Sequence, residues 1–293
     1  MELRDVLQRF LFEHTAVRGE LVQLDTSWRE VLGRHDYPPG VRRLLGEMMA
    51  AAALLSATLK FSGSMTMQIQ GGGPVSLLVV ECGADLGMRA VAKWEGVVED
   101  GAGLPELVGN GHFVITLDPG EGKKTYQGIV EVTGDTVAEA LEHYMAHSEQ
   151  LETRLFLAAD EWGAAGMLLQ KLPGGRDGDQ DAWNRAVQLG RTLTAAELLG
   201  LTRQGILRRL YHEEDVRLFD PVPVSFRCSC SRERVAAVLR MLGQDEVTAA
   251  LAERGLVEVN CEFCNQHYQF DEVDVVHLFT AGAVLPPGGN TRH

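Results

Sequence analysis

Four of the five cysteines lie in the last quarter of this 293-residue chain, in two close pairs 30 residues apart: Cys228-Ser229-Cys230 and Cys261-Glu262-Phe263-Cys264. A tetrahedral zinc site suits this arrangement, because each pair supplies two thiolates and the intervening segment brings the pairs together. His267 follows Cys264 by three residues, so a site of three cysteines and one histidine stays open. The pattern predicts a small domain built around one zinc ion per reduced chain.

The same cysteines indicate a redox switch. A disulfide across the single residue between Cys228 and Cys230 would be strained and readily reduced. A domain of about 55 residues around zinc depends on metal binding, worth roughly 10 to 16 kcal/mol in peptides, so oxidising its thiolates should remove the metal and unfold it. A thiol oxidoreductase is the alternative, but Cys264 precedes a strand-like run, Tyr268-Gln269-Phe270, and does not open a helix that would lower its pKa.

Charge and hydropathy narrow the class of protein. Lys and Arg number 27 against 41 Asp and Glu, a net charge of -14 that opposes binding to nucleic acid and disfavours a zinc-ribbon regulator. The most apolar stretch, Met48 to Leu59, is shorter than the roughly 20 residues that a membrane span needs. The N-terminus carries no secretory signal pattern, and we expect a cytoplasmic protein with no membrane or nucleic-acid partner.

The first block, residues 1–178, is expected to be an α+β core. We predict a helix over Asp5 to His14, a strand over Ala16 to Leu24, a capping box at Ser27 and Glu30, and a long buried helix after Pro38-Pro39. Period-two alternation then predicts antiparallel strands from Met65, at Val75 to Glu81, Met88 to Trp94, His112 to Asp118 and Tyr126 to Val132. A helix over Thr136 to Gln150 and strands at Arg154 to Ala159 and Met167 to Leu172 complete the block.

A turn-rich acidic stretch from Pro173 to Asp179 ends this block. Residues 179–226 are expected to form a metastable helical linker, with a capping box at Thr194 and Glu197 and too few residues for a core of its own. Residues 227–280 are expected to form the zinc-binding redox-switch domain, and residues 281–293 a disordered tail.

Other candidate sites are weaker. His143 and His147 lie four residues apart with Glu139 on the same helical side, but this is typical of a solvated polar face. Gly120 to Thr125 lacks the spacing of a phosphate-binding loop and is expected to be a hairpin turn. The sequence assigns no role to Cys82, and it indicates no catalytic residues.

The cysteine motifs and their neighbours closely resemble those of the 33 kDa chaperonins, a family of bacterial redox-regulated heat-shock chaperones. The segments that carry the resemblance are Cys228-Ser229-Cys230-Ser231-Arg232-Glu233-Arg234 and Cys261-Glu262-Phe263-Cys264-Asn265-Gln266-His267-Tyr268-Gln269-Phe270. Supporting matches are Ala16-Val17-Arg18-Gly19-Glu20-Leu21, His35-Asp36-Tyr37-Pro38, Val108-Gly109-Asn110-Gly111, Gly166-Met167-Leu168-Leu169-Gln170 and Arg209-Leu210-Tyr211-His212-Glu213-Glu214. The resemblance covers essentially the whole chain.

The resemblance implies a holdase that works without ATP and is not an enzyme. Cys228, Cys230, Cys261 and Cys264 would ligate zinc in a largely inactive reduced protein. Oxidation would form the disulfides Cys228 with Cys230 and Cys261 with Cys264, release zinc, unfold the C-terminal domain and destabilise the linker. Unfolding or oxidatively damaged proteins would then be captured and kept from aggregating, commonly by a homodimer.

Overall fold

The protein is described by a computed structural model over residues 4–58, 63–120, 123–173 and 181–280. The chain divides into two compact units, Met1–Arg227 and Cys228–His293. No helix within the described ranges is long and apolar enough to cross a membrane.

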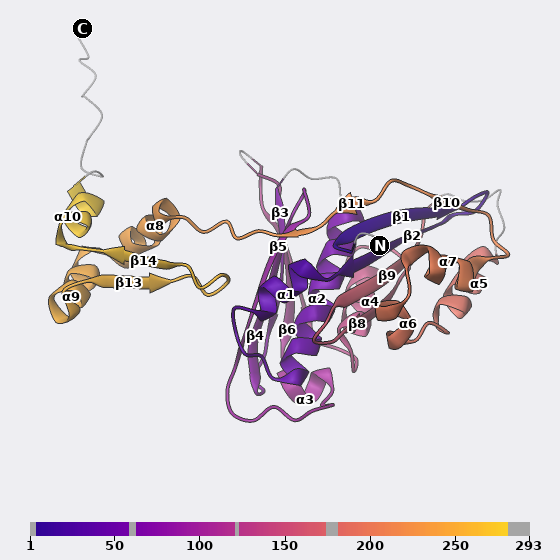
Figure 1. Cartoon of the computed structure of the whole chain (residues 1–293), viewed down its shortest axis with the longest axis horizontal. Coiled ribbons are helices and arrows are strands. Elements are labelled where there is room, and N and C mark those ends of the chain that lie inside the picture. The colour runs from indigo at the N-terminus through magenta and orange to yellow at the C-terminus, as the bar shows by residue number, and fades with distance from the viewer. Residues whose placement is uncertain (1–3, 59–62, 121–122, 174–180, 281–293) are drawn as a thin grey trace, which may run out of the picture. The chain divides into compact units, whose positions relative to one another are not determined.

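The first unit contains two six-stranded sheets (Figure 1). Sheet A runs in the order β10-β1-β2-β9-β8, with β11 also on β1, and consists of β1 (Val6–Phe12), β2 (Val17–Leu24), β8 (Thr153–Ala159), β9 (Ala164–Lys171), β10 (Val216–Leu218) and β11 (Val222–Pro223). Sheet B runs in the order β12-β5-β4-β3-β6-β7 and consists of β3 (Ser64–Gln70), β4 (Val75–Gly83), β5 (Gly87–Trp94), β6 (His112–Asp118), β7 (Tyr126–Glu131) and β12 (Ser225–Phe226). Pairing is antiparallel except between β12 and β5, which are parallel.

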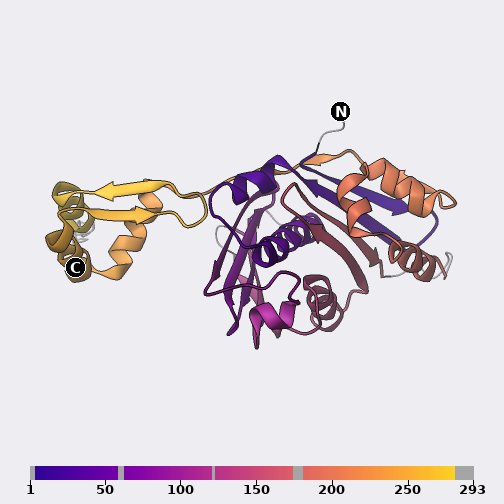
Figure 2. The same cartoon turned by 60° about the horizontal axis from the view of Figure 1, so that its bottom comes forward.

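A long helix, α2 (Pro39–Thr58), lies between the two sheets (Figure 2). It is buried almost all round, and Gly46 lets sheet A approach it closely: a Cβ at this position would lie 2.4 Å from Ala159 Cβ. The helix α4 (Val137–His147) packs beside it against β8. The short helices α1 (Thr26–Leu32) and α3 (Leu104–Val108) contact β5 and β4 respectively. The first core therefore fills the space between the sheets, as the α+β prediction requires.

The other face of sheet A is covered by α5 (Ala182–Gly190), α6 (Ala195–Gly200) and α7 (Arg203–Tyr211). A second hydrophobic cluster joins them to the sheet, with Phe10, Leu21 and Met167 on the strands and Ile206 and Leu210 on α7. The expected capping box is confirmed, since Glu197 N–H donates to Thr194 Oγ1 at 3.3 Å and Thr194 N–H donates to Glu197 Oε2 at 2.9 Å. The three short helices thus depend on sheet A for their core.

Two expectations near the N-terminus are wrong. The helix expected over Asp5 to His14 is the strand β1, whose apolar residues resemble a helical stripe because both faces of the strand are buried. Ser27 does not cap α1 as expected. Its N–H and that of Asp25 donate to the Asp5 carboxylate at 2.9 and 3.0 Å, so a distant side chain satisfies the start of the helix.

Beyond α7, the chain to Phe226 forms the three short strands β10, β11 and β12, which the sequence did not lead us to expect. Pro221 and Pro223, considered locally, are typical of residues that end a helix. Instead the segment runs along sheet A and then joins the edge of sheet B. Pro223 sits in an edge strand, a position where the missing N–H is tolerated.

The second unit is small. It contains α8 (Arg232–Leu242), α9 (Gln244–Arg254), the hairpin strands β13 (Val257–Asn260) and β14 (His267–Phe270), and α10 (Glu272–Thr280). Its buried core comprises Ala236, Leu239, Val247, Val257, Phe270, Val275 and Leu278. A core of this size gives little independent stability. The tail expected at 281–293 lies outside the described residues.

Candidate metal centre

Each cysteine pair is held by a defined local structure. Cys261 and Cys264 lie in the turn between β13 and β14, where Cys261 N–H donates to Gln266 O at 2.9 Å and Asn265 N–H donates to Cys261 O at 2.8 Å. Asn265 takes a left-handed conformation with φ 58°, which Asn tolerates better than most residues. Cys228 and Cys230 precede α8, whose N-cap Ser231 accepts a hydrogen bond from Arg234 N–H at 3.3 Å.

The four sulfurs come together at metal-ligand spacing. Cys228 Sγ lies 3.7 Å from Cys261 Sγ, Cys230 Sγ lies 3.4 Å from Cys264 Sγ, and all four lie within 4.8 Å of one another. Four sulfurs about 2.3 Å from a tetrahedral ion would be about 3.8 Å apart. None of these cysteines is disulfide-bonded. The donor set and its spacing therefore fit a tetrahedral metal ion.

Burial opposes ionisation of Cys261 and Cys264 unless a cation is bound. Burial raises the pKa of Cys264 to about 12, and its hydrogen bonds with the neighbouring thiols add to the rise. Burial also raises the pKa of Cys261. Such thiols hold their protons at neutral pH unless a cation compensates the charge, and a coordinating metal ion deprotonates them outright. Four thiolates around a divalent ion leave a net charge of -2.

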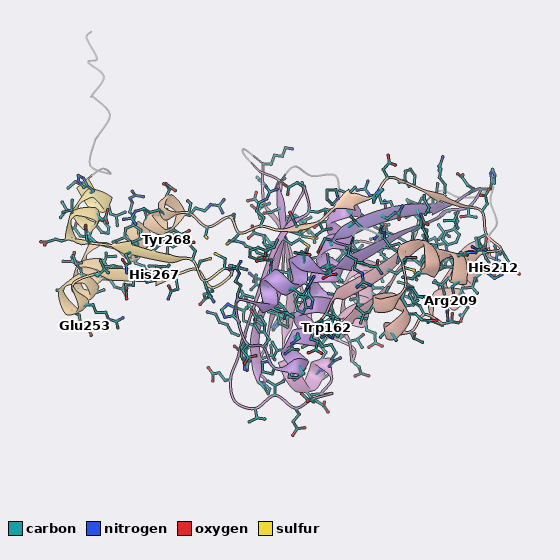
Figure 3. The ribbon with its side chains drawn as sticks, in the orientation of Figure 1. Trp162, Arg209, His212, Glu253, His267 and Tyr268 are labelled. Carbon is teal, nitrogen blue, oxygen red and sulfur yellow. The ribbon has the colours of Figure 1, made fainter. Side chains whose placement is uncertain are left out.

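Two side chains beside the cluster make contacts that the sequence alone did not indicate. Tyr268, which is labelled in Figure 3, donates its hydroxyl hydrogen to Cys230 Sγ at 3.1 Å and so orients this ligand. Only the alternation of β14, which puts Tyr268 and Phe270 on one face, could have indicated it. Arg232 donates to Asp274 Oδ2 at 2.6 Å and to Gln269 O at 2.7 Å. Its guanidinium also lies 4.3 Å from the Phe270 ring centre, so Arg232 ties α8 to the hairpin.

The remaining candidates lie outside this cluster. His267 directs Nδ1 to Asn260 Oδ1 at 2.6 Å and Nε2 to Glu258 Oε1 at 3.2 Å. His143 and His147 stack with ring centres 3.9 Å apart on α4, and among the described residues no third ligand joins them. Cys82 is buried in sheet B, and burial raises its pKa to about 12.

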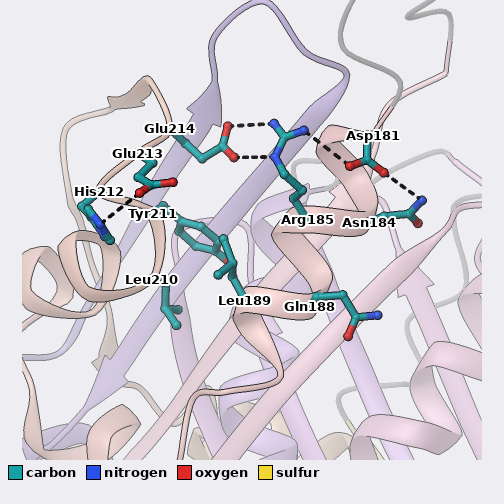
Figure 4. Close-up of a pocket in the computed structure, with 10 residues that line it drawn as sticks. All are labelled: Asp181, Asn184, Arg185, Gln188, Leu189, Leu210, Tyr211, His212, Glu213 and Glu214. Atoms are coloured by element: carbon teal, nitrogen blue, oxygen red, sulfur yellow. Dashed lines mark hydrogen bonds and ion pairs between the residues drawn. The ribbon is translucent and has the colours of Figure 1, made fainter.

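A cavity of about 450 Å³ lies between α5 and the end of α7, lined by part of the Arg209 to Glu214 motif (Figure 4). Arg185 on α5 donates to both carboxylate oxygens of Glu214, at 3.0 and 3.2 Å, and lies 3.7 Å from Asp181. Arg209 on α7 pairs with Glu197 on α6 at 2.6 Å. These ion pairs join α5 to the segment that follows α7, and α7 to α6, whereas apolar residues join the three helices to sheet A.

Comparisons with known proteins agree with this architecture. The model of the family described as "Hsp33 protein" matches residues 5–271. The 33 kDa chaperonin of Methylobacillus flagellatus is 53% identical with 100% of both chains covered, and that of Azotobacter vinelandii is 52% identical with 99% of each covered. The crystal structure of the 33 kDa chaperonin of Thermotoga maritima covers 95% of this chain and 99% of its own with a TM-score of 0.79, and at 21% identity it supports the fold. The chain therefore belongs to the Hsp33 family of chaperones.

Proposed function

We propose that this protein is a redox-regulated holdase that works without ATP and is switched on when Cys228, Cys230, Cys261 and Cys264 are oxidised. The observation that carries the proposal is the convergence of four sulfurs at metal-ligand spacing in a unit with a seven-residue buried core. Such a unit gains much of its stability from the bound metal. Oxidation of the four cysteine ligands would therefore unfold this unit.

The proposed cofactor is one zinc ion per reduced chain, held by these four thiolates. Thiolate ligands in tetrahedral geometry suit zinc, which has no redox chemistry of its own. The ion would supply structural cross-linking and deprotonate its ligands. This chain's residues then act as the sensor, because the cysteine thiolates are the nucleophiles that react with a peroxide.

The redox step balances with peroxide as oxidant. Four zinc-bound thiolates, two molecules of hydrogen peroxide and four protons give two disulfides, four water molecules and free Zn²⁺. We propose Cys228 with Cys230 and Cys261 with Cys264 as the disulfides. The sulfur distances of 3.7 and 3.4 Å join cysteines of different pairs, so mapping the disulfides by mass spectrometry is a direct test.

Capture of clients would follow from unfolding. With residues 227–280 unfolded, the linker of residues 179–226 would lose its C-terminal anchor and α5, α6 and α7 would leave sheet A. That would uncover Phe10, Leu21, Met167 and their neighbours, together with the apolar faces of the helices. Exposed apolar surface of this kind binds unfolded chains. We propose unfolded proteins as partners, a homodimer in the oxidised state and a cytoplasmic location.

A thiol oxidoreductase is the less supported alternative. Its attacking cysteine needs a lowered pKa, usually at a helix N-terminus. Cys261 and Cys264 instead lie in a β-hairpin turn, where burial raises the pKa of both thiols. We therefore expect no turnover with small disulfides.

Light scattering of an unfolding client, without nucleotide, tests the proposal. Peroxide-treated protein should suppress aggregation and reduced protein should not, while a chromogenic chelator reports one zinc released per chain. Cys82→Ser is the matched control, since its buried thiol should not contribute and the switch should persist. Equal suppression by reduced and oxidised protein would rule out the redox switch.

A further inference from the structure

Residues 215–227, here called the strap, link the helical region to the first cysteine and cover the edges of both sheets. Main-chain hydrogen bonds run along its whole length: Glu13 N–H to Asp215 O (2.8 Å), Phe219 N–H to Arg9 O (3.0 Å), Val224 N–H to Asp5 O (2.8 Å), Ser225 N–H to Leu86 O (3.2 Å) and Arg227 N–H to Met88 O (2.7 Å). Arg9 lies on β1 and Glu13 follows it four residues later on the same side, as the alternation of a strand requires, while Asp5 accepts just before β1 begins. The strap therefore supplies the outer strand of sheet A and of sheet B.

Several side chains of the strap contribute little to this attachment. Leu218, Phe219 and Val222 are 39%, 45% and 36% exposed, although they are large and apolar. Val224 is 4% exposed and lies within the first core, and the partly buried Phe226 and Val216 pack against the first and second clusters. Arg217 and Arg227 also form ion pairs with Glu13 and Asp85. Main-chain hydrogen bonds do not depend on residue type, so other extended chains can make the same contacts.

Prolines make the strap a poor template for further strands. Val224 directs its N–H to β1, so alternation puts the nitrogen of Pro223 on the outer side, where it has no hydrogen to donate. The covered strands differ, because Val6–Phe12 and Gly87–Trp94 contain no proline. Removing the strap would leave the outer edges of β1 and β5 unpaired.

We propose that β1 and β5 capture extended segments of unfolded clients by strand addition, in the places that the strap vacates. This rests on the proposed function and specifies its client surface. The preferred client is a segment without proline whose apolar residues alternate, because Phe12 lies opposite Val216 and Phe10 opposite Leu218. A client strand on β1 would place alternate side chains beside these two aromatic rings. Capture would then require this general pattern and no particular client sequence.

The test releases the strap from β1 and β5 without oxidising the cysteines. In the full-length reduced protein, Val224→Asp puts a charge where a buried valine anchors the strap and should release it. Val222→Asp, the same change at an exposed position two residues away, should leave the strap in place. Amide exchange in the ladder between β2 and β9 checks that both variants remain folded.

The probe is a ten-residue peptide of alternating valine and threonine, compared with a matched peptide whose amides are replaced by esters, which keep the side chains but lack N–H groups. We expect Val224→Asp to bind the amide peptide at least tenfold more tightly than the ester peptide, and Val222→Asp to bind neither. The Glu13 amide, which is bonded to the strap, should lose exchange protection in Val224→Asp and regain it with the amide peptide. Amides that bond β2 should stay protected throughout.

Equal binding of the two peptides, or bound peptide without renewed protection of Glu13, would show that capture uses apolar faces and would overturn the proposal. Protection that returns with protein concentration alone would assign the edge to a second copy of this chain, which also overturns it. The two proposals can also be separated. If reduced Val224→Asp discriminates between the peptides but peroxide does not activate the wild type, the proposed function is refuted and strand addition at β1 and β5 is still supported.

Discussion

Ile206→Ala should make the reduced protein a partial holdase. Ile206 lies on α7 and is fully buried in the cluster that joins the linker helices to sheet A. The change removes three carbons at about 0.8 kcal/mol each, and the remaining cavity adds to this loss, for a total of about 3 kcal/mol. Since about 1.4 kcal/mol is tenfold in an equilibrium, the undocked linker should become roughly 100-fold more populated.

Two measurements check this chain of reasoning. Amide exchange should accelerate by about two orders of magnitude in α5 to α7 and change little in β3 to β6, and reduced protein should suppress aggregation in light scattering. Ile129→Ala is the matched control, because Ile129 on β7 is 58% exposed and its truncation should affect neither measurement. If the helices of Ile206→Ala open faster but the reduced protein still fails to hold clients, undocking is not what activates it.

Three further outcomes are expected. Cys261→Ser should abolish stoichiometric zinc in metal analysis, whereas His267→Ala should retain it, because His267 is bonded to Asn260 and Glu258; zinc lost from the histidine variant would contradict the four-cysteine site. A strong chelator should remove roughly 10 to 16 kcal/mol of metal-binding free energy and abolish exchange protection after Cys228, while β3 to β6 stay protected; a protected apo domain would show that its apolar core suffices. Burial raises the pKa of Glu20 to about 7, so near neutral pH the folded state binds a proton that the unfolded chain has lost. The free energy of unfolding should therefore fall by on the order of 3 kcal/mol as the pH rises from about 5 to about 8. Glu20→Gln should flatten that fall in urea titrations, and an unchanged slope would assign it to other groups.

The sequence predicted elements well where one face of a strand meets solvent. On β3, Met65, Met67 and Ile69 are buried while Thr66 and Gln68 are more exposed, and this alternation is visible in the letters alone. β1 was misread because both of its faces are buried, which removes the alternation. β10 to β12 were missed because their pairing depends on strands about 140 to 220 residues earlier, and the prolines in this segment indicate a break when considered locally.

The site was easier to predict than the fold around it. Metal ligation needs few residue types at short spacing, so Cys228, Cys230, Cys261 and Cys264 were identifiable without knowledge of the fold. Their neighbours were not, because Tyr268 reaches Cys230 across 38 residues and Arg232 reaches Asp274 across 42. Contacts at such separations depend on tertiary packing, which local patterns do not specify.

The separation in sequence between β1 and its outer partner β10 also determines when the two strands can pair during translation. β1 ends at Phe12 and can pair with β2 early, but β10 begins only at Val216. At roughly 5 to 20 residues per second, this partner leaves the ribosome roughly 10 to 40 s after β1 does. Sheet A is therefore built from one side first, and in every newly made molecule one edge of β1 stays unpaired for most of translation.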